Sequence, residues 1–376
     1  MSNKKVKNML GKKGFDLNQG IKGGKYSILK IFHHSEKLNS FLAGKITSPL
    51  YVRIKPTNTC CHNCFYCVYN PWFSSIHPES NRSDMIPREK LLEVLRDLKD
   101  MNVKAVTFSG GGEPLTYPHI VEALKKTLDY RINLSMITNA QLLKGEAAEL
   151  LGQGDWIRVS LDYCDEDTFS KIRGKPGELF NEVKENLKKF AEIKNSSCDF
   201  EVNCVVGEHN FDKVLDIAKF CQKIGVDNLR FAPVWKQNFE KYHEPFKEKA
   251  VEQIKKAEEL QDDSFSVGST YDRYFEKTTG QSSRAYKRCF YMECVPVIAA
   301  NQGVYTCHNC AYEPMAKIGS IQNKSFKELW FSQETAEFLK NFNPQKICTH
   351  ECSNDEKNKI LNEWMACRDD KISNFI

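Results

Sequence analysis

The chain has 376 residues, of which 41% are hydrophobic and 27% are charged, as in a globular protein with a sizeable core. It has no run of 18 apolar residues, and its first ten residues lack the apolar stretch of a secretion signal. This composition excludes a membrane span and favours a cytoplasmic protein. The net charge of +5 is uneven, because residues 1–50 carry ten lysines against Asp16 and Glu36.

The basic start of the chain has two interpretations. Such an arm can dock on nucleic acid or on an anionic membrane surface, and it can equally be a solvated tail. Apolar residues then recur at helical spacing up to Gly44, which suits a helix end. They are Leu29, Phe32, Leu38, Phe41 and Leu42. We predict a basic N-terminal extension over residues 1–48 with one short helix that packs on the main domain.

Strand and helix patterns alternate over residues 49–240. The strand candidates cover residues 50–55, 105–110, 132–138, 156–161, 199–206 and 228–234. The helical patterns cover residues 88–102, 118–129, 140–151, 178–193 and 211–224. Serial strand–helix units form a parallel sheet with helices outside it, and six units are too few for a closed eight-stranded barrel. We predict an α/β fold with a partial (βα)6 TIM-like barrel, whose chemistry lies at the carboxyl ends of the strands.

Four cysteines lie within eight residues directly after the first predicted strand. Fifteen cysteines in a reducing compartment form a surplus that metal ligation explains best. Cys60, Cys64 and Cys67 have the spacing C-x3-C-x2-C, and three thiolates on one loop can hold three irons of a [4Fe–4S] cluster. The fourth iron is then open to a small molecule. The alternative set of ligands, which begins at Cys61, has the C-x2-C-x2-C spacing of ferredoxins but lacks their fourth cysteine followed by proline. We therefore interpret Cys61 as a spare thiol. We interpret His62 as a loop residue.

The segment SGGGEP follows the second predicted strand at residues 109–114. Its glycines allow the backbone to approach a ligand closely. Glu113 can accept hydrogen bonds from an ammonium group at the same rim. Taken alone, the segment is equally well explained as a plain strand-to-helix turn.

In this order the motifs resemble the radical SAM superfamily. The signature comprises the cysteine loop with aromatic Tyr66 before its last cysteine, SGGGEP, ITNA at 137–140 and VSLDYCDEDTFSKIRG at 159–174. The resemblance covers residues 50 to about 235 and implies that S-adenosylmethionine binds the open iron through its amino and carboxylate groups. The implied contacts of this cofactor are Tyr66 near the adenine, Gly111, Gly112 and Glu113 at the methionine end, Thr138, Asn139 and Ser160 at the ribose and carboxylate, and Arg173 at the carboxylate.

Some of these residues have ordinary structural alternatives. Thr138 and Asn139 can cap a helix, and Arg173 can form a surface ion pair. The resemblance also implies the chemistry: one electron from the reduced cluster cleaves the C5′–S bond, and the 5′-deoxyadenosyl radical abstracts hydrogen from an unactivated C–H bond. An electron donor such as a flavodoxin or ferredoxin is therefore an expected partner.

Beyond a connecting helical segment at 241–288, we predict a smaller domain of a β-hairpin and helices over residues 289–376. Two apolar stretches flank Asn301 and Gln302 as hairpin strands would. With its seven cysteines, this domain resembles the SPASM and twitch extensions, which carry auxiliary iron–sulfur clusters. The implied ligands of one auxiliary [4Fe–4S] cluster are Cys289, Cys307, Cys352 and either Cys348 or Cys294, with Cys310 and Cys367 as alternates.

The C-terminal match departs from the family in two places. Gly303 lies one residue later than the family glycine. Only the last pair of a four-cysteine block is present, as Cys348 and Cys352. A second complete auxiliary cluster is therefore not expected.

Other classes of protein remain open for this segment. Two cysteine pairs, Cys307 with Cys310 and Cys348 with Cys352, could instead bind one zinc ion. Together with the basic arm, a zinc module would indicate an RNA-modifying enzyme. The basic residues lie at the opposite end of the chain, which disfavours that interpretation. A protein that only transfers electrons would leave SGGGEP without a use.

A catalytic base or hydrogen donor is expected between the barrel and the hairpin. The segment STYDRYFEK at 269–277 offers Asp272 and Arg273 as candidates, and the alternative is packing with a solvated ion pair. The isolated thiols lie on strand or helix faces and are interpreted as core residues: Cys164, Cys198, Cys204 and Cys221.

The predicted activity is that of a radical SAM oxidoreductase acting on a small polar substrate such as a sugar derivative, by oxidation (dehydrogenation) or epimerisation. About 48 residues precede the barrel, and they lack the pattern of the leader-binding domain common in peptide maturases, which favours a small substrate. The first alternative is a peptide- or protein-modifying maturase that forms thioether or carbon–carbon cross-links or performs sulfatase-type residue oxidation. The second is an RNA-modifying enzyme with a zinc module. No stable nucleic-acid or membrane partner is expected.

Overall fold

The computed structural model describes residues 27–69, 77, 79–236, 238–272, 275, 284–348 and 352–367. The chain divides into two compact units. The smaller unit combines residues up to Thr47 with those from Ser353 onward, and the larger unit runs from Ser48 to Cys352.

The smaller unit is helical in its described part. Its elements are η1 (Ile28–His33), α3 (Ser35–Ala43) and α16 (Asp355–Cys367). Phe32 packs edge-on against Trp364, with ring centres 6.2 Å apart. α3 ends at Gly44, whose φ of +63° is the left-handed conformation that glycine adopts without strain. The short helix predicted from the N-terminal pattern is therefore present, while the lysine-rich arm before residue 27 lies outside the described residues.

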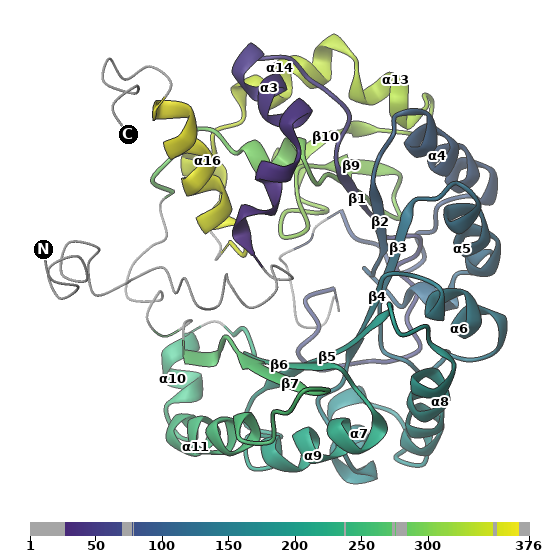
Figure 1. Ribbon diagram of the computed structural model, residues 1–376, viewed down its shortest axis with the longest axis vertical. Coiled ribbons are helices and arrows are strands. Elements are labelled where there is room, and N and C mark those ends of the chain that lie inside the picture. Colours follow the sequence, from purple (N-terminus) through teal and green to yellow (C-terminus); the bar gives the residue numbers. More distant parts are fainter. Residues whose placement is uncertain are drawn as a thin grey trace, which may run out of the picture. The chain divides into compact units, whose positions relative to one another are not determined.

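The larger unit is built on one curved, ten-stranded sheet (Figure 1). The strand order is β10-β9-β8-β1-β2-β3-β4-β5-β6-β7. Neighbouring strands from β1 to β7 are parallel, and β8 is parallel to β1, whereas β9 and β10 are antiparallel to their neighbours. The strands are β1 (Tyr51–Ile54), β2 (Ala105–Phe108), β3 (Asn133–Thr138), β4 (Trp156–Ser160), β5 (Asp199–Val206), β6 (Asn228–Pro233), β7 (Ser266–Ser269), β8 (Val297–Ile298), β9 (Gly303–Tyr305) and β10 (Lys317–Ser320).

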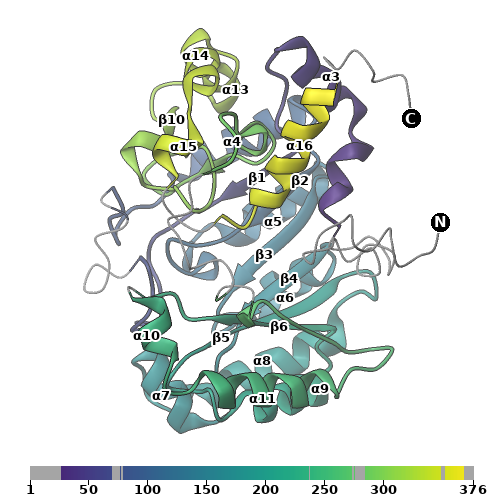
Figure 2. The same ribbon diagram turned by 90° about the vertical axis from the view of Figure 1, so that its left-hand side faces the viewer.

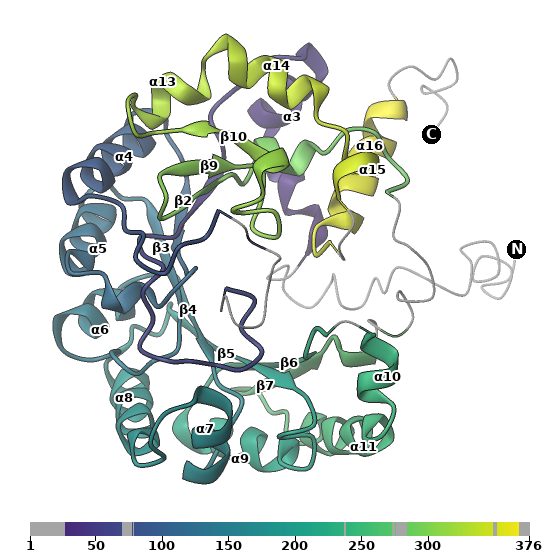
Figure 3. The same ribbon diagram turned by 180° about the vertical axis from the view of Figure 1, so that it is seen from behind.

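Helices cover the outer, convex side of the parallel strands, as Figures 1 and 3 show. The barrel helices are α4 (Arg88–Asp100), α5 (Ile120–Asp129), α6 (Gly145–Gly152), α7 (Glu166–Arg173), α8 (Leu179–Ile193), α9 (Val214–Ile224), α10 (Phe239–His243) and α11 (Lys247–Glu258). Short 3-10 turns and helices complete the unit: η2 (Pro114–Thr116), η3 (Phe290–Glu293), η4 (Pro314–Ala316), α13 (Phe326–Trp330), α14 (Gln333–Asn341) and α15 (Pro344–Ile347). In the turned view of Figure 2, α13, α14 and α15 lie together with β10.

The predicted fold class is confirmed: all six predicted strands occur as β1 to β6, in a parallel sheet that helices cover on the outside. The structure adds a seventh parallel strand, β7, inside the segment that we expected to be helical. β7 has the sequence SVGS, in which Val267 alone is buried, so it carries no alternating apolar pattern. Pairing with β6, rather than its own sequence, makes it a strand.

The predicted hairpin is also present, but it is not a separate sheet. β8 pairs with β1 in register Arg53 to Val297 and Ile54 to Ile298, so the hairpin extends the barrel sheet past its first strand. The C-terminal cysteines are thereby held beside the strand that leads into the first cysteine loop.

The two faces of the parallel strands differ in polarity because side chains alternate along a strand. In β1, Val52 and Ile54 are fully buried, whereas Tyr51 and Arg53 belong to the opposite face. On that inner face the Tyr51 hydroxyl donates to Thr107 Oγ1 at 2.6 Å, and Arg53 Nε donates to the Tyr51 hydroxyl at 2.9 Å. The concave side of the sheet is therefore lined by polar groups.

Three of the four isolated thiols lie in the core of the fold. Cys198, Cys204 and Cys221 are fully buried, as expected of core residues, while Cys164 is half-buried. Within the described ranges, none of the helices has the length and apolar character needed to cross a bilayer.

Candidate functional site

The loop after β1 and the loop after β2 lie backbone against backbone. The amide of Gly112 donates to the Thr57 carbonyl at 3.1 Å, and the amide of Glu113 donates to the Thr59 carbonyl at 2.9 Å. A Cβ on Gly111 would lie 1.9 Å from Asn58 Oδ1, and a Cβ on Gly112 would lie 2.0 Å from the Thr59 carbonyl oxygen. Only glycine permits this approach.

A cavity of about 210 Å³ opens between these loops and the ends of β3 and β4. Cys60, Cys64 and Cys67 all line it, whereas Cys61 does not. Seven of the predicted cofactor contacts line it as well: Gly111, Gly112, Glu113, Thr138, Asn139, Ser160 and Arg173. Folding thus brings together residues that follow four different strands. These residues span more than 100 positions of the sequence.

Glu113 is a buried carboxylate held by the end of β3. It accepts hydrogen bonds from Thr138 Oγ1 at 2.6 Å, from the Asn139 amide at 2.7 Å and from the Leu115 amide at 3.1 Å. Burial raises the pKa of Glu113, and these donors oppose the rise. Two ionised oxygens offer about four acceptor positions, so one remains for a ligand.

A buried charge network lies on the other side of the cavity. Arg173 pairs with Asp162 at 3.1 Å and donates to Cys64 Sγ at 3.1 Å, to the Ser160 carbonyl at 2.6 Å and to the Tyr66 hydroxyl at 3.3 Å. The Tyr66 hydroxyl also donates to Asp162. Burial lowers the pKa of Arg173, but the neighbouring anionic groups outweigh it and the pKa lies well above its ordinary value. The guanidinium therefore stays cationic. Burial raises the pKa of the Cys64 thiol, and the neighbouring Arg173 opposes that rise.

Asp162 was not predicted from sequence as a site residue. It follows β4 directly, and its Oδ1 accepts from the Val205 amide at 2.6 Å, so the carboxylate also ties β4 to β5. A carboxylate immediately after a parallel strand was the available signal. Tyr66 does not line the cavity, but its bonds to Arg173 and Asp162 place it next to Cys64.

Cys60 has Cys61 and Asn139 as neighbours. Asn139 Nδ2 lies 3.3 Å from Cys61 Sγ and 3.9 Å from Cys60 Sγ. A hydrogen bond to Cys61 raises the pKa of Cys60 and lowers that of Cys61. His62 is buried, its Nε2 faces Gln141 Oε1 at 3.3 Å, and burial lowers its pKa to about 3. His62 is thus a neutral loop residue.

The C-terminal thiols form a second group. Hydrogen bonding from Cys310 lowers the pKa of Cys307 to about 6 and also lowers the pKa of Cys348. Burial raises the pKa of Cys289, and the thiols of Cys307, Cys352 and Cys348 raise it further. Five thiols are therefore neighbours. Cys294 instead places its sulfur 3.6 Å from the Phe290 carbonyl, on the β1 side of the turn η3.

These thiols fit iron–sulfur clusters. All fifteen cysteines are free thiols. In the part of the chain that the structure describes, no three His, Cys, Asp or Glu side chains converge as ligands of one metal ion. Cluster thiolates bind different irons and do not need to converge. In the first cavity Arg173 Nε is buried without a hydrogen-bond partner, which leaves a donor for a ligand.

Asp272, one of the two proposed catalytic residues, does not belong to either group of thiols. Asp272 is exposed and lies in a shallow hollow with Lys247 and Lys255 of α11, and it does not line the cysteine cavity. Arg273 lies outside the described residues. The catalytic role of both residues stays a prediction from sequence.

Family comparison agrees with this geometry. The chain matches the radical SAM superfamily over residues 54–221 and the SPASM iron–sulfur cluster-binding domain over residues 289–353. Residues 54–221 thus form a radical SAM domain and residues 289–353 a C-terminal SPASM domain, as the motifs predicted. [4Fe–4S] clusters and S-adenosylmethionine are the cofactors of such a protein, and this prediction is confirmed.

Individual curated relatives are similar over about half of the chain. A probable GTP 3′,8-cyclase of Saccharolobus islandicus is 31% identical over 183 residues, which are 47% of this chain and 54% of the relative. A probable GTP 3′,8-cyclase of Methanococcus aeolicus is 32% identical over 199 residues, 51% of this chain and 62% of the relative. The chain thus spans about half the length of the curated relatives it matches.

Solved structures share the fold over more of the chain. SuiB of Streptococcus suis, bound to the precursor peptide SuiA, aligns with a TM-score of 0.59 at 18% identity and covers 91% of this chain and 78% of its own. Native anSMEcpe with bound AdoMet aligns with a TM-score of 0.53 at 19% identity, covering 87% and 100%. At these identities the likeness concerns the fold.

The buried ion pair predicts a large stability effect. Asp162→Ala leaves the Arg173 guanidinium without its carboxylate, and removing one partner of a buried pair costs about 3–5 kcal/mol. The control is Asp167→Ala, which removes an exposed pair with Lys171 at 2.7 Å and should change the stability little, because solvent screens such a pair. Guanidinium unfolding of both anaerobically prepared variants, followed by circular dichroism, measures the difference. Equal midpoints would contradict the assigned role of Asp162.

Proposed function

We propose that this protein cleaves S-adenosylmethionine at a [4Fe–4S] cluster held by Cys60, Cys64 and Cys67, and that it abstracts hydrogen from a small polar substrate. The observation that carries the proposal is the single cavity lined by these three thiols and by Gly111–Glu113. Bound together, the cluster and cofactor supply a 5′-deoxyadenosyl radical.

The protein's own residues bind and orient the cofactor in this proposal. Glu113 offers its remaining acceptor position to the amino group, because its other positions are taken by Thr138, Asn139 and Leu115. The Arg173 guanidinium offers Nε to the carboxylate, because Asp162 and Ser160 hold its Nη2 and Cys64 and Tyr66 hold its Nη1. A cation fixed in this way needs little reorganisation when the ligand binds.

One auxiliary [4Fe–4S] cluster is proposed on the C-terminal thiols. The thiols of Cys307, Cys352 and Cys348 all raise the pKa of Cys289, whereas Cys294 places its sulfur beside the Phe290 carbonyl, which supports Cys348 over Cys294 as the fourth ligand. Cys310 is a close neighbour of Cys307 and Cys348 and is the alternate. The match of this segment to an iron–sulfur cluster-binding domain favours a cluster over the zinc module, on which the RNA-modifying alternative depends.

A small polar substrate is favoured by the polar inner face of the barrel. Arg158 donates to Glu201 Oε2 at 3.0 and 2.7 Å from β4, and Arg53 lies on the same face of β1. The curated sequence relatives are named for GTP, a small polar molecule. The proposed outcome is a dehydrogenation or an epimerisation in the cytoplasm, with a flavodoxin or ferredoxin as electron donor.

A peptide-modifying maturase is the second candidate. The fold neighbour SuiB was solved with a precursor peptide, which favours this candidate by likeness of fold. The two candidates differ in the source of the abstracted hydrogen. Deuterium should enter 5′-deoxyadenosine from deuterated nucleotide or sugar derivatives, and mass spectrometry detects it. Transfer from a deuterated peptide, with none from the small molecules, would decide for the maturase.

Metal counts test the two-cluster proposal. Anaerobically reconstituted protein should hold about eight irons and eight sulfides per chain, and should form 5′-deoxyadenosine with S-adenosylmethionine and dithionite. Replacing Cys60, Cys64 and Cys67 together by alanine should leave about four irons and abolish 5′-deoxyadenosine. The matched control is Cys61→Ala, which should retain both. Zinc in place of iron at the C-terminal site, or cleavage in the triple variant, would contradict the proposal.

Single substitutions locate the fourth auxiliary ligand. Cys348→Ala should lower the auxiliary iron content and weaken the electron paramagnetic resonance signal of the auxiliary cluster, because it removes one of the four thiolates proposed to hold that cluster. Cys294→Ala should keep both the iron and the signal, since its sulfur faces the Phe290 carbonyl. The reverse pattern would assign the ligand to Cys294.

A further inference from the structure

Lys55 is a fully buried lysine without a carboxylate partner. It follows β1 directly and has 0% of its surface exposed. Its ammonium donates to the Tyr69 hydroxyl at 2.5 Å, and it lies 4.2 Å from the centre of the Tyr69 ring and 5.2 Å from that of Tyr312. No ion pair to Lys55 occurs among the residues that the structure describes. Such a charge is costly to bury unless something nearby compensates it.

The groups around Lys55 come from both cysteine clusters. Tyr69 lies two residues beyond Cys67, and Tyr312 lies two residues beyond Cys310. Burial and the charge of Arg53 lower the pKa of Lys55 to about 7, whereas the thiols of Cys307 and Cys67 raise it. Lys55 therefore stands between the first cysteine loop and the C-terminal thiols.

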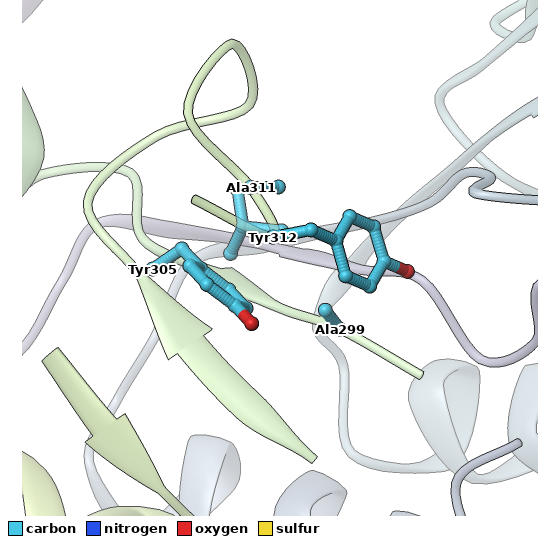
Figure 4. Packing of buried hydrophobic residues seen from close by; sticks show 5 residues of the cluster. Ala299, Tyr305, Ala311 and Tyr312 are labelled. Atoms are coloured by element: carbon cyan, nitrogen blue, oxygen red, sulfur yellow. The ribbon is translucent and has the colours of Figure 1, made fainter. Parts of the chain in front are cut away.

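Tyr312 fixes this arrangement. Its hydroxyl donates to Asn58 Oδ1, which is also the atom nearest to the position that a Cβ on Gly111 would take. Its ring packs in a buried cluster with Ala299, Tyr305 and Ala311, which Figure 4 shows. The segment that carries Cys307 and Cys310 is thus joined to the loop that carries Cys60, Cys64 and Cys67, with Lys55 enclosed between them.

A role in substrate binding does not suit this geometry. Lys55 does not line the cavity, and its surface is inaccessible to solvent. A purely structural role would need only the apolar stem of the side chain. The ammonium itself is explained if anionic groups stand on both sides of it, as thiolate-ligated clusters would.

We propose that Lys55 is a shared counter-charge that sets the reduction potential of the clusters beside it. Adding one electron makes an iron–sulfur cluster more negative by one charge, and a fixed cation nearby stabilises that reduced form. Burial strengthens the effect, because little solvent screens the charge. The inference rests on the proposed placement of clusters at Cys60, Cys64 and Cys67 and at the C-terminal thiols.

The test compares three substitutions in the reconstituted full chain. Lys55→Met removes the charge and keeps an apolar stem, Lys55→Gln removes the charge and keeps a donor for Tyr69, and Lys55→Arg keeps the charge. Redox titration followed by electron paramagnetic resonance measures the potential of each cluster. The matched control is Lys171→Met, which removes an exposed lysine that pairs with Asp167.

Lys55→Met and Lys55→Gln should each lower the equilibrium constant for one-electron reduction of at least one cluster tenfold. This corresponds to a reduction potential that is lower by about 59 mV. Lys55→Arg and Lys171→Met should stay at the wild-type potential. Unchanged potentials in a neutral variant that retains about eight irons would overturn the role of Lys55 alone. Fewer than two clusters in the wild type would overturn the proposed function first, so the two failures are distinguishable.

Discussion

The close approach of two backbones, the loop after β1 and the loop after β2, is the constraint on which the rest of the site depends. Gly111 and Gly112 have no side chains, so the amides of Gly112 and Glu113 reach the carbonyls of Thr57 and Thr59. This contact brings the Glu113 carboxylate to the rim where the cysteines lie. A Cβ at either glycine would push the two loops apart and open the cavity.

Charge organises the site around that contact. Buried Glu113 is surrounded by donors from β3, and buried Arg173 is held by Asp162 and by the neighbouring thiol of Cys64. The hydrogen-bond donors favour the ionised form of Glu113 against the effect of burial, and the anionic neighbours keep Arg173 cationic. β8 pairs with β1 and thereby brings the C-terminal thiols to the side of β1. Lys55 follows β1 directly and contacts Tyr69, next to the first cysteine loop, and Tyr312, next to the C-terminal thiols.

Much of this architecture is predictable from sequence because it depends on local patterns. The six parallel strands have apolar runs between helical segments, and the cysteine and glycine motifs each follow a strand. β7 escapes prediction because SVGS has only one buried apolar residue and is a strand through pairing alone. Asp162 and Lys55 are not predicted because each has a partner that is distant in sequence, Tyr66 for Asp162 and Tyr312 for Lys55. The choice of Cys348 over Cys294 likewise depends on tertiary placement.

Electron paramagnetic resonance of the reduced protein, with and without S-adenosylmethionine, tests the central claim most directly. A cluster with an open iron changes its spectrum when a ligand binds that iron, and a fully ligated auxiliary cluster does not. The structure predicts two signals, of which one shifts on addition of the cofactor and is missing when Cys60, Cys64 and Cys67 are replaced by alanine. A spectrum that does not respond to the cofactor would contradict an open iron at the first cysteine loop.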